Sequence, residues 1–238
     1  MLPLVSQKPP FKNRVLAMLS PADISCLSPE LVPTHFKLNQ SLYEPGEMID
    51  TVYFLEDAIA SVVVTMENGS TVEVGLIGRD GVVGLPAVIG SGYATNRTFI
   101  QLPGSGFTLK AKILRRLEES SAKLRSCLHV AVQGYLAQTA QTAACNRVHE
   151  LEERLARWLM MCSDRLQSND IPITHEFLAM MLGTRRSSVT IAAGILHKSG
   201  LIAYSRGSVT IKNRDGLAHA ACECYQSVQQ EYLRLGLL

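Results

Sequence analysis

The chain has 238 residues, a formal net charge of +2 and a hydrophobic fraction of 47%. These globular values exclude collagen-like, low-complexity and disordered classes, and the length corresponds to one large domain or two small ones. The six cysteines form no C-x-x-C pair, so their spacing predicts neither a metal module nor a disulfide framework. The sequence shows neither a signal peptide nor a run of roughly 20 apolar residues. We therefore expect a cytoplasmic protein with no membrane contact.

Residues 35–110 have the composition of a β domain. Val, Ile, Tyr, Phe and Thr are frequent there, and turn dipeptides such as Pro45-Gly46 and Asp80-Gly81 separate short apolar runs. Asn68-Gly69 lies between two such runs, which is typical of a two-residue hairpin. Short strands at this spacing predict a small antiparallel sandwich or barrel.

Residues 111–166 contain one glycine and no proline, and they are rich in helix-forming residues. The stretch 120–147 is poor in charge, and small or apolar residues recur in it at Cys127, Ala131, Gly134 and Cys145. We predict a long helix whose small, weakly charged face packs against a copy of itself, which would make the protein a homodimer. The alternative is that this face packs against the chain's own sheet.

From residue 169 onward the pattern changes again. Thr174 can cap a helix that ends before Gly183, and a second helix is predicted from Thr184 to about Lys198. Two short apolar runs then flank a Ser-Arg-Gly turn and predict a β-hairpin. Helix, tight turn, helix and two-stranded wing is the order of a winged helix-turn-helix.

This segment is also basic. The 38 residues between Glu176 and Asp215 contain no carboxylate, whereas six of them are Arg or Lys. A charge run is usually only a solvated face. Here it coincides with a helix-turn-helix and its wing, where positive charge can neutralise the phosphates of double-stranded DNA. We therefore predict that the segment binds DNA.

The second helix has an inner and an outer face. Val189, Ala192, Ala193 and Leu196 recur at helical spacing and should face the core. The outer face carries Arg side chains that can reach guanine, and hydroxyls that can reach phosphates. We predict DNA contacts at eight positions: Thr174, Arg185, Arg186, Ser187, Ser188, Thr190, Ile191 and Arg206.

Four motifs span most of the chain. The first lies within residues 43–56 and includes the segments YEPGE and VYFLE; the others are 148–159, 177–189 (FLAMMLGTRRSSV) and 221–225 (ACECY). Together they resemble the CRP/FNR superfamily of bacterial transcription regulators. In that family they correspond to the start of a cyclic-nucleotide-binding-type jelly roll, the hinge and first DNA-binding helix, the helix-turn-helix, and the tail of one branch.

The resemblance implies an α+β fold with an N-terminal antiparallel β jelly roll, a long dimerisation helix and a C-terminal winged helix-turn-helix. The expected domains are 1–119, 120–147 and 148–238. The implied function is a homodimeric, sequence-specific transcription regulator, not an enzyme, which contacts RNA polymerase if it is an activator. The alternative function is a regulatory ligand-binding subunit that acts on a protein partner.

The signal is not identified by the resemblance. Cyclic-AMP-binding members pair a Gly-Glu with the ribose and an Arg-Ser or Arg-Thr with the phosphate, and here Gly84-Leu85 and Arg97-Thr98 stand in those places. Arg97 and Thr98 remain a candidate effector phosphate site, but the missing ribose acceptor predicts that cyclic AMP does not bind. An iron–sulfur cluster is not expected either, since Cys26 is the sole cysteine near the N-terminus. A haem ligated by His35 or His129 is left open.

The operator sequence is also open. Arg186 occupies the family's base-reading arginine position, but Ser187 and Ile191 replace residues that are often Glu and Arg. A short hydroxyl and an aliphatic chain cannot make the same contacts, although Ile191 can touch a thymine methyl group. The family's usual operator is therefore not expected.

Overall fold

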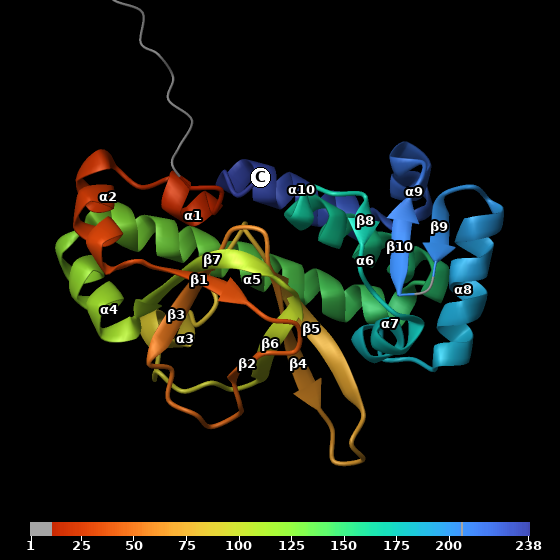
Figure 1. Ribbon diagram of the computed structural model, residues 1–238, viewed down its shortest axis with the longest axis horizontal. Coiled ribbons are helices and arrows are strands. Elements are labelled where there is room, and N and C mark those ends of the chain that lie inside the picture. Colours follow the sequence, from red (N-terminus) through yellow and green to blue (C-terminus); the bar gives the residue numbers. More distant parts are fainter. Residues whose placement is uncertain (1–10, 206) are drawn as a thin grey trace, which may run out of the picture.

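The computed structural model describes residues 11–205 and 207–238; Arg206, one of the predicted DNA contacts, lies outside the described residues. The chain forms a β-rich half and a helical half, and one long helix runs along both (Figure 1). Among the described residues, no helix is long and apolar enough to cross a membrane.

The β-rich half begins with two short helices, α1 (Arg14–Ala17) and α2 (Pro21–Leu27), and a 3-10 turn at Ser28–Glu30. Seven strands follow: β1 (Val32–Phe36), β2 (Ser41–Tyr43), β3 (Thr51–Leu55), β4 (Ile59–Thr65), β5 (Thr71–Ile77), β6 (Arg97–Leu102) and β7 (Gly104–Lys110). A short helix, α3 (Pro86–Ile89), interrupts the strands between β5 and β6. The seven strands form two antiparallel sheets, in the orders β1-β7-β3 and β2-β6-β4-β5, as expected for a jelly roll.

The predicted hairpin at Asn68-Gly69 joins β4 and β5, but its loop has a different length. Met66 and Ser70 still pair, because the Met66 amide donates to the Ser70 carbonyl at 2.8 Å. The loop therefore contains three residues, not two. Gly69 closes it with φ +81° and donates its amide to the Met66 carbonyl at 2.9 Å, which is the left-handed bulge that three-residue hairpins use.

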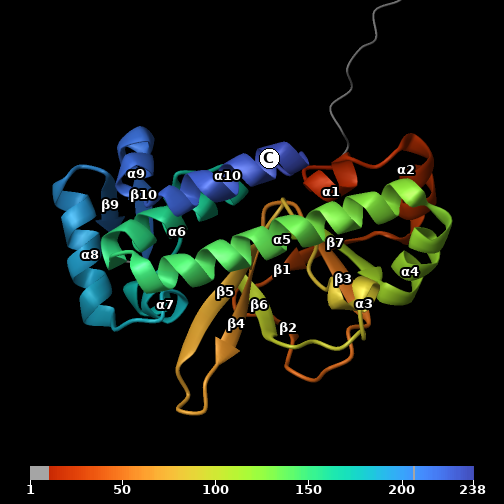
Figure 2. The same ribbon diagram turned by 180° about the vertical axis from the view of Figure 1, so that it is seen from behind.

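The long helix is α5 (Ala122–Val148), preceded by α4 (Ala111–Ser120). It lies between the sheets and the C-terminal helix α10 (Glu223–Leu235), and one of its sides is uncovered (Figure 2). The small face predicted to meet a second copy is buried inside the chain instead: Cys127, Ala131, Gly134 and Cys145 are all buried. A Cβ on Gly134 would lie 2.7 Å from Leu237 Cδ1, so the C-terminal tail occupies this face. That choice of dimer face was wrong, because the face packs within the chain; Gly134 and Cys145 meet the C-terminal segment and not the sheet that the alternative named.

The helical half contains the predicted winged order. Its elements are α6 (Leu151–Leu166), β8 (Asp170–Ile171), α7 (His175–Met181), α8 (Arg186–Lys198), β9 (Ile202–Ser205), β10 (Ser208–Ile211), α9 (Arg214–Ala220) and α10. The wing is a three-stranded sheet in the order β8-β10-β9, and β8 has no counterpart in the sequence prediction because it is two residues long. The second helix begins at Arg186 and not at Thr184, because Arg185 is still extended and acts as its N-cap.

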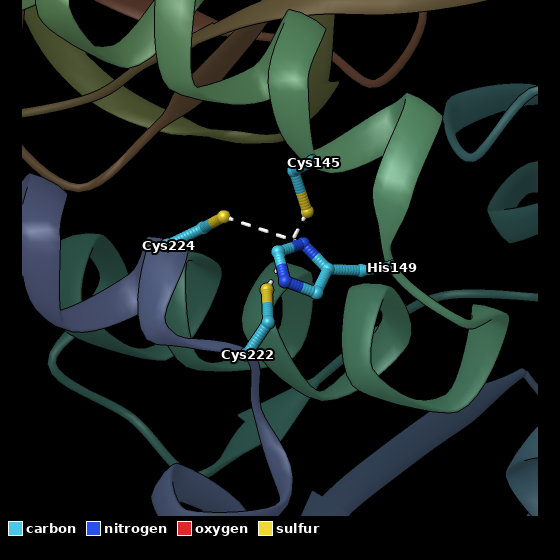
Figure 3. Close-up of side chains that lie close together, drawn as sticks. All are labelled: Cys145, His149, Cys222 and Cys224. Carbon is cyan, nitrogen blue, oxygen red and sulfur yellow. Dashed lines mark hydrogen bonds between the residues drawn. The ribbon is translucent and has the colours of Figure 1, made fainter.

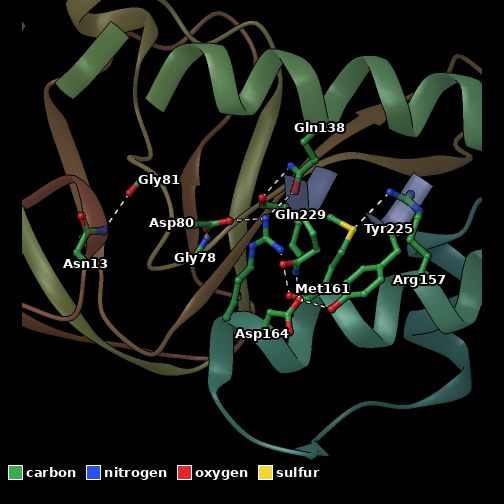
Figure 4. A network of polar contacts seen from close by, with 12 residues as sticks. Asn13, Gly78, Asp80, Gly81, Gln138, Arg157, Met161, Asp164, Tyr225 and Gln229 are labelled. Atoms are coloured by element: carbon green, nitrogen blue, oxygen red, sulfur yellow. Dashed lines mark hydrogen bonds and ion pairs between the residues drawn. The ribbon is translucent and has the colours of Figure 1, made fainter. Parts of the chain in front are cut away.

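The two halves are joined by a mixed core. Apolar residues of β4, β5 and β6 share one hydrophobic cluster with α6, α7 and α8. Beside that cluster Arg165 forms an ion pair with Asp80 at 2.5 Å, and both side chains are 5% exposed. Figure 4 shows Asp80 and Gln138 within this network of polar contacts. Gln138 accepts a hydrogen bond from Arg165 at 2.7 Å and donates to the Leu76 carbonyl at 2.9 Å. Buried polar contacts of this kind require one geometry, so they define how the halves are oriented.

Candidate nucleic-acid interface

The turn between α7 and α8 is held by capping contacts. The Thr174 hydroxyl accepts a hydrogen bond from the Phe177 amide at 3.2 Å, which starts α7 as predicted. Gly183 ends it with φ +61°, and the Thr184 amide donates to the Ala179 carbonyl at 2.9 Å. A side chain at Gly183 would also meet Val72 of β5 at 2.9 Å, so this glycine serves both the turn and a close approach of the two halves.

The inner face of α8 agrees with the prediction. Val189, Ala192, Ala193 and Leu196 are between 0% and 4% exposed, and they pack on α6 and α7. Their burial fixes the rotation of α8 about its own axis. The opposite face must therefore point to solvent.

That outer face carries the predicted contact residues. Arg185, Arg186, Ser187, Thr190 and Ile191 are exposed, and Ser188 is half-buried. Ile191 is 65% exposed, which is high for a large aliphatic residue. A Cβ at Gly194 would meet nothing within 4 Å, so this glycine is not required by packing inside the chain. The structure thus brings most of the predicted DNA contacts together on one accessible helix face, and Thr174 lies exposed at the start of the neighbouring helix.

The arginine at the start of α8 is weakly held. Arg186 Nε lies 3.8 Å from Glu176 Oε2, and the two side chains are 70% and 79% exposed. An exposed ion pair of this length contributes roughly 0–1 kcal/mol, so Arg186 can exchange this partner for a base or a phosphate.

A histidine links the two helices to the wing. The His175 ring stacks on Tyr204 of β9 at a centroid distance of 4.0 Å, and its Nδ1 contacts the Thr190 hydroxyl at 3.1 Å. Burial lowers the pKa of His175, and the positive charge of Arg186 lowers it further. The ring is therefore neutral at pH 7 and acts as a spacer between α7, α8 and the wing. The sequence contained no signal for this contact.

The β-rich half encloses a separate cavity of about 220 Å³ against α5. Its lining is mainly apolar and includes Leu85, Tyr135 and Leu136, with the Thr98 side chain among its few polar groups. Arg97 is not one of the described residues that line it: its Nε lies 3.3 Å from Glu44 Oε1, and its guanidinium lies over the Phe99 ring. Of the two candidate phosphate ligands, only Thr98 therefore reaches the cavity.

The remaining cofactor candidates lie on the surface. Cys26 is exposed on α2, while His35 on β1 and His129 on α5 are also exposed. None of these three residues lines the cavity.

A second cluster was missed by the sequence analysis. Cys145, His149, Cys222 and Cys224 come together at the junction of α5 and α10, with all their candidate ligand atoms within 4.8 Å of one another (Figure 3). The cysteine spacing predicted no metal module because Cys145 and Cys222 are 77 residues apart. The available signals were the C-x-x-x-H of residues 145–149 and the C-x-C of residues 222–224.

Comparison with known proteins agrees with this geometry. Residues 153–220 match the family model of the Crp-like helix-turn-helix domain. The global nitrogen regulator of Synechocystis sp. is 22% identical over 200 residues, which cover 79% of this chain and 87% of that protein. The structure of FixK2 from Bradyrhizobium japonicum superimposes with a TM-score of 0.70 at 15% identity, over 81% of this chain and 98% of FixK2. A CRP/FNR-family transcriptional regulator from Thermus thermophilus gives a TM-score of 0.66 at 20% identity, over 80% and 98% of the two chains.

The β jelly roll, the long helix and the winged helix with an exposed recognition helix define a DNA-binding transcription regulator. Residues 153–220 form a helix-turn-helix domain of the Crp-like type, and the whole chain has the fold of the CRP/FNR-family regulators that it resembles.

Proposed function

We propose that this protein is a homodimeric, sequence-specific regulator in which residues 1–119 sense a signal, 120–147 dimerise and 148–238 bind DNA. The observation that carries the proposal is the outer face of α8, where two arginines, two hydroxyls and Ile191 are exposed together. Because bacterial DNA lies in the cytoplasm, the protein acts there. If it activates transcription, RNA polymerase is its further partner.

The α8 residues divide into readers and anchors. Arg186 and Ile191 lie on the exposed side of the helix, where a guanidinium can fork onto guanine and an aliphatic chain can touch a thymine methyl group. Thr174, Arg185, Ser188 and Thr190 carry groups suited to phosphate oxygens. By its place in the sequence, between the two predicted wing strands, Arg206 is proposed as a further phosphate contact.

The function is tested by selecting binding sequences from a pool of random duplex DNA and measuring their affinity at physiological salt. We expect a selected site with two half-sites about 10 base pairs apart, bound at least 10³-fold more tightly than random DNA. Failure to enrich any sequence, with only salt-sensitive non-specific binding, would contradict the proposal. Retention of a protein partner without DNA binding would favour the regulatory-subunit alternative.

The uncovered side of α5 supplies a surface for dimerisation. Its exposed residues recur at alternating steps of four and three along the whole helix: Ala122, Ser126, His129, Gln133, Leu136, Ala140, Ala143 and Arg147. A 3.5-residue repeat is the spacing with which two helices pack along their length. Small residues on both sides of Leu136 (Ala122 and Ser126 before it, Ala140 and Ala143 after it) let the helices approach closely. We assign this stripe, and not the buried small face, to the dimer.

Leu136 also connects the dimer to the sensor. It is 61% exposed on the proposed seam, yet it lines the cavity of the jelly roll together with Val132 and Tyr135. A molecule that enters the cavity therefore contacts the dimer helix directly. This contact gives a route by which a signal changes the spacing of the two recognition helices.

The cavity favours an uncharged signal. None of the described residues that line it carries a formal charge, and Leu85 occupies the place of the ribose acceptor. The phosphate of cyclic AMP would be desolvated there without a counter-charge, which is costly. We expect isothermal titration with cyclic AMP to give no binding at micromolar concentrations.

A further inference from the structure

The cysteine–histidine cluster lies at the hinge between the long helix and the DNA-binding half. Cys145 is in the last turn of α5, and His149 is the C-cap residue of the same helix. Cys222 is the N-cap residue of α10, and Cys224 is in the first turn of that helix. Two chain segments distant in sequence therefore each contribute two ligands, which is the pairing by which structural zinc sites join two elements.

The distances match tetrahedral coordination. The Sγ atoms of Cys145 and Cys222 are 3.5 Å apart, and Cys224 Sγ lies 3.5 Å from His149 Nδ1. Zinc bonds of about 2.3 Å to sulfur and 2.1 Å to nitrogen place two ligands of a tetrahedron at separations of roughly 3.6–3.8 Å. The four groups can therefore close on one ion with small movements. All three cysteines are at least 95% buried, and His149 is 14% exposed.

The neighbouring polar groups orient the ligands. His149 Nε2 lies 3.0 Å from Glu223 Oε2, so its N–H can donate a hydrogen bond to the carboxylate, which leaves the Nδ1 lone pair directed at the sulfurs. Gln141 Nε2 donates to Cys224 Sγ at 3.1 Å, which stabilises a thiolate. Carboxylate–histidine pairs and hydrogen bonds to sulfur are the usual outer contacts of a metal site.

The surrounding charge also suits a metal–thiolate group. Three thiolates and one divalent ion carry a net charge of −1, which needs a nearby cation where it is buried. Arg154 and Arg157 of α6 lie within electrostatic range of the Cys145 sulfur. The cluster therefore has ligands, orienting groups and compensating charge.

We propose that Cys145, His149, Cys222 and Cys224 bind one structural Zn²⁺ ion per chain. Three thiolates and an imidazole in a closed tetrahedron form a donor set that zinc prefers, and no ligand position is left open for catalysis. The ion ties α10 to the end of α5. Since Tyr225 Oη of α10 also donates to Asp164 of α6 at 2.9 Å, the ion fixes the hinge through which α5 orients the winged helix.

The test is to measure the metal content of the full-length protein by inductively coupled plasma mass spectrometry. The protein is purified under reducing conditions and without chelators. We expect about one Zn²⁺ per chain. Exchange for Co²⁺ should produce the thiolate charge-transfer and intense visible bands of a tetrahedral cobalt site. Cys222→Ser and Cys224→Ser should lose both signals, whereas Cys26→Ser should keep them because Cys26 is exposed on α2, away from the cluster.

A gentler variant keeps the test decisive if the cysteine variants fail to fold. Glu223 is 74% exposed, so Glu223→Gln leaves the core intact and removes only the charge behind His149. We expect the zinc affinity of this variant, measured in competition with a chromophoric chelator, to be roughly 10–100-fold lower than that of the wild type. Wild-type protein with less than about a tenth of an equivalent of metal and no cobalt bands would overturn the proposal. So would a Cys145–Cys222 disulfide found in place of metal.

Discussion

At the scale of single residues, the outer face of α8 combines Arg186, which we expect to read a base, with the exposed aliphatic side chain of Ile191. Arg186 can form two parallel hydrogen bonds to guanine, whereas Ile191 offers only apolar contact. Arg185 precedes the helix as its N-cap, so we expect it to contact the DNA backbone and not the bases. The two adjacent arginines are therefore expected to have different roles.

The first prediction separates these roles. Arg186→Ala should cost roughly 1–3 kcal/mol per half-site and relax the preference at one base pair. Arg185→Ala should weaken all sequences alike and reduce the slope of log affinity against log salt by about 0.9 for each phosphate that is no longer neutralised. Salt titrations of both variants on the selected operator and its single-base changes measure the two effects. Unchanged base preference in Arg186→Ala would show that another side chain reads the base.

Glu73 is a buried carboxyl group whose pKa is raised. Burial raises its pKa to about 7, although hydrogen bonds from Ser61 and Trp158 and the charges of Arg157 and Arg165 oppose that shift. The Trp158 indole donates to Glu73 Oε1 at 2.9 Å, which links β5 to α6. The carboxyl is therefore a titratable group inside the contact between the two halves.

This raised pKa predicts a pH-dependent stability. Between the ordinary value of 4.5 and about 7, the folded chain keeps a proton that the unfolded chain has lost. The free energy of unfolding should therefore fall across this window, by on the order of 3 kcal/mol, and level off above it. Glu73→Gln should remove the fall and leave the variant more stable than wild type at pH 8. Urea unfolding from pH 4 to 8 gives the free energy of unfolding against pH for the wild type and for Glu73→Gln. Parallel curves for the two proteins would contradict the raised pKa of Glu73.

At the scale of elements, three faces of α5 differ in what covers them. One face packs on the sheets, a second on α10, and the third carries the exposed 4-3 repeat. The helical spacing in the sequence predicted a face of small residues on this helix, but it did not determine which part of the protein packs against that face. The C-terminal tail covers it, with Tyr232 and Leu237 packed against Gly134.

The third prediction distinguishes the faces of α5. Ala140→Glu places two like charges opposite each other in the proposed seam, which costs several kcal/mol and should raise the dimer dissociation constant at least about 100-fold. The monomer should remain folded because Ala140 is exposed. Ala131→Glu should instead lower the melting temperature, since Ala131 is 2% exposed. Sedimentation equilibrium measures the dimer dissociation constant, and circular dichroism measures the melting temperature. Ala22→Glu, at an exposed position on α2, is the control and should change neither. A monomeric wild type would contradict the proposed dimer seam.

At the scale of the whole molecule, buried charges orient the two halves. Arg165 of α6 meets Asp80, which follows β5, and a Cβ on Gly78 would clash with the Arg165 stem at 2.9 Å. This ion pair and the Glu73–Trp158 hydrogen bond both join the β-rich half to α6. Any rotation of the winged helix away from the jelly roll must break them.

The fourth prediction tests that connection. Asp80→Ala leaves the Arg165 guanidinium buried without its partner and should cost about 3–5 kcal/mol of unfolding free energy. Asp80→Ala combined with Arg165→Met should recover most of this loss. Lys12→Ala, which breaks an exposed pair with Asp57 at 3.5 Å, should cost less than about 1 kcal/mol. Equal losses in the buried and exposed variants would show that the pair does not orient the halves.

Local patterns in the sequence were sufficient for most elements, but not for the short strand β8, the first residue of α8 or the length of the β4–β5 loop. Asn68-Gly69, the cap at Thr174 and Gly183 are signals carried by a few adjacent residues, and each lies where the prediction placed it. The inner face of α8 followed from helical spacing, because burial repeats with the same period as the helix. The outer face, with Arg186 and Ile191, is the complement of that set.

Tertiary structure alone decided which surfaces meet. The partner of the small α5 face, the cavity lined by Thr98 but not Arg97, and the cluster of Cys145, His149 and Cys222 all depend on contacts between segments far apart in the chain. Spacing rules detect ligands that lie on one turn or hairpin, whereas this cluster forms because α10 folds back along α5. Local sequence therefore determined most elements and their exposed chemistry, whereas long-range packing determined which face of α5 is left uncovered and which cysteines and histidine come together.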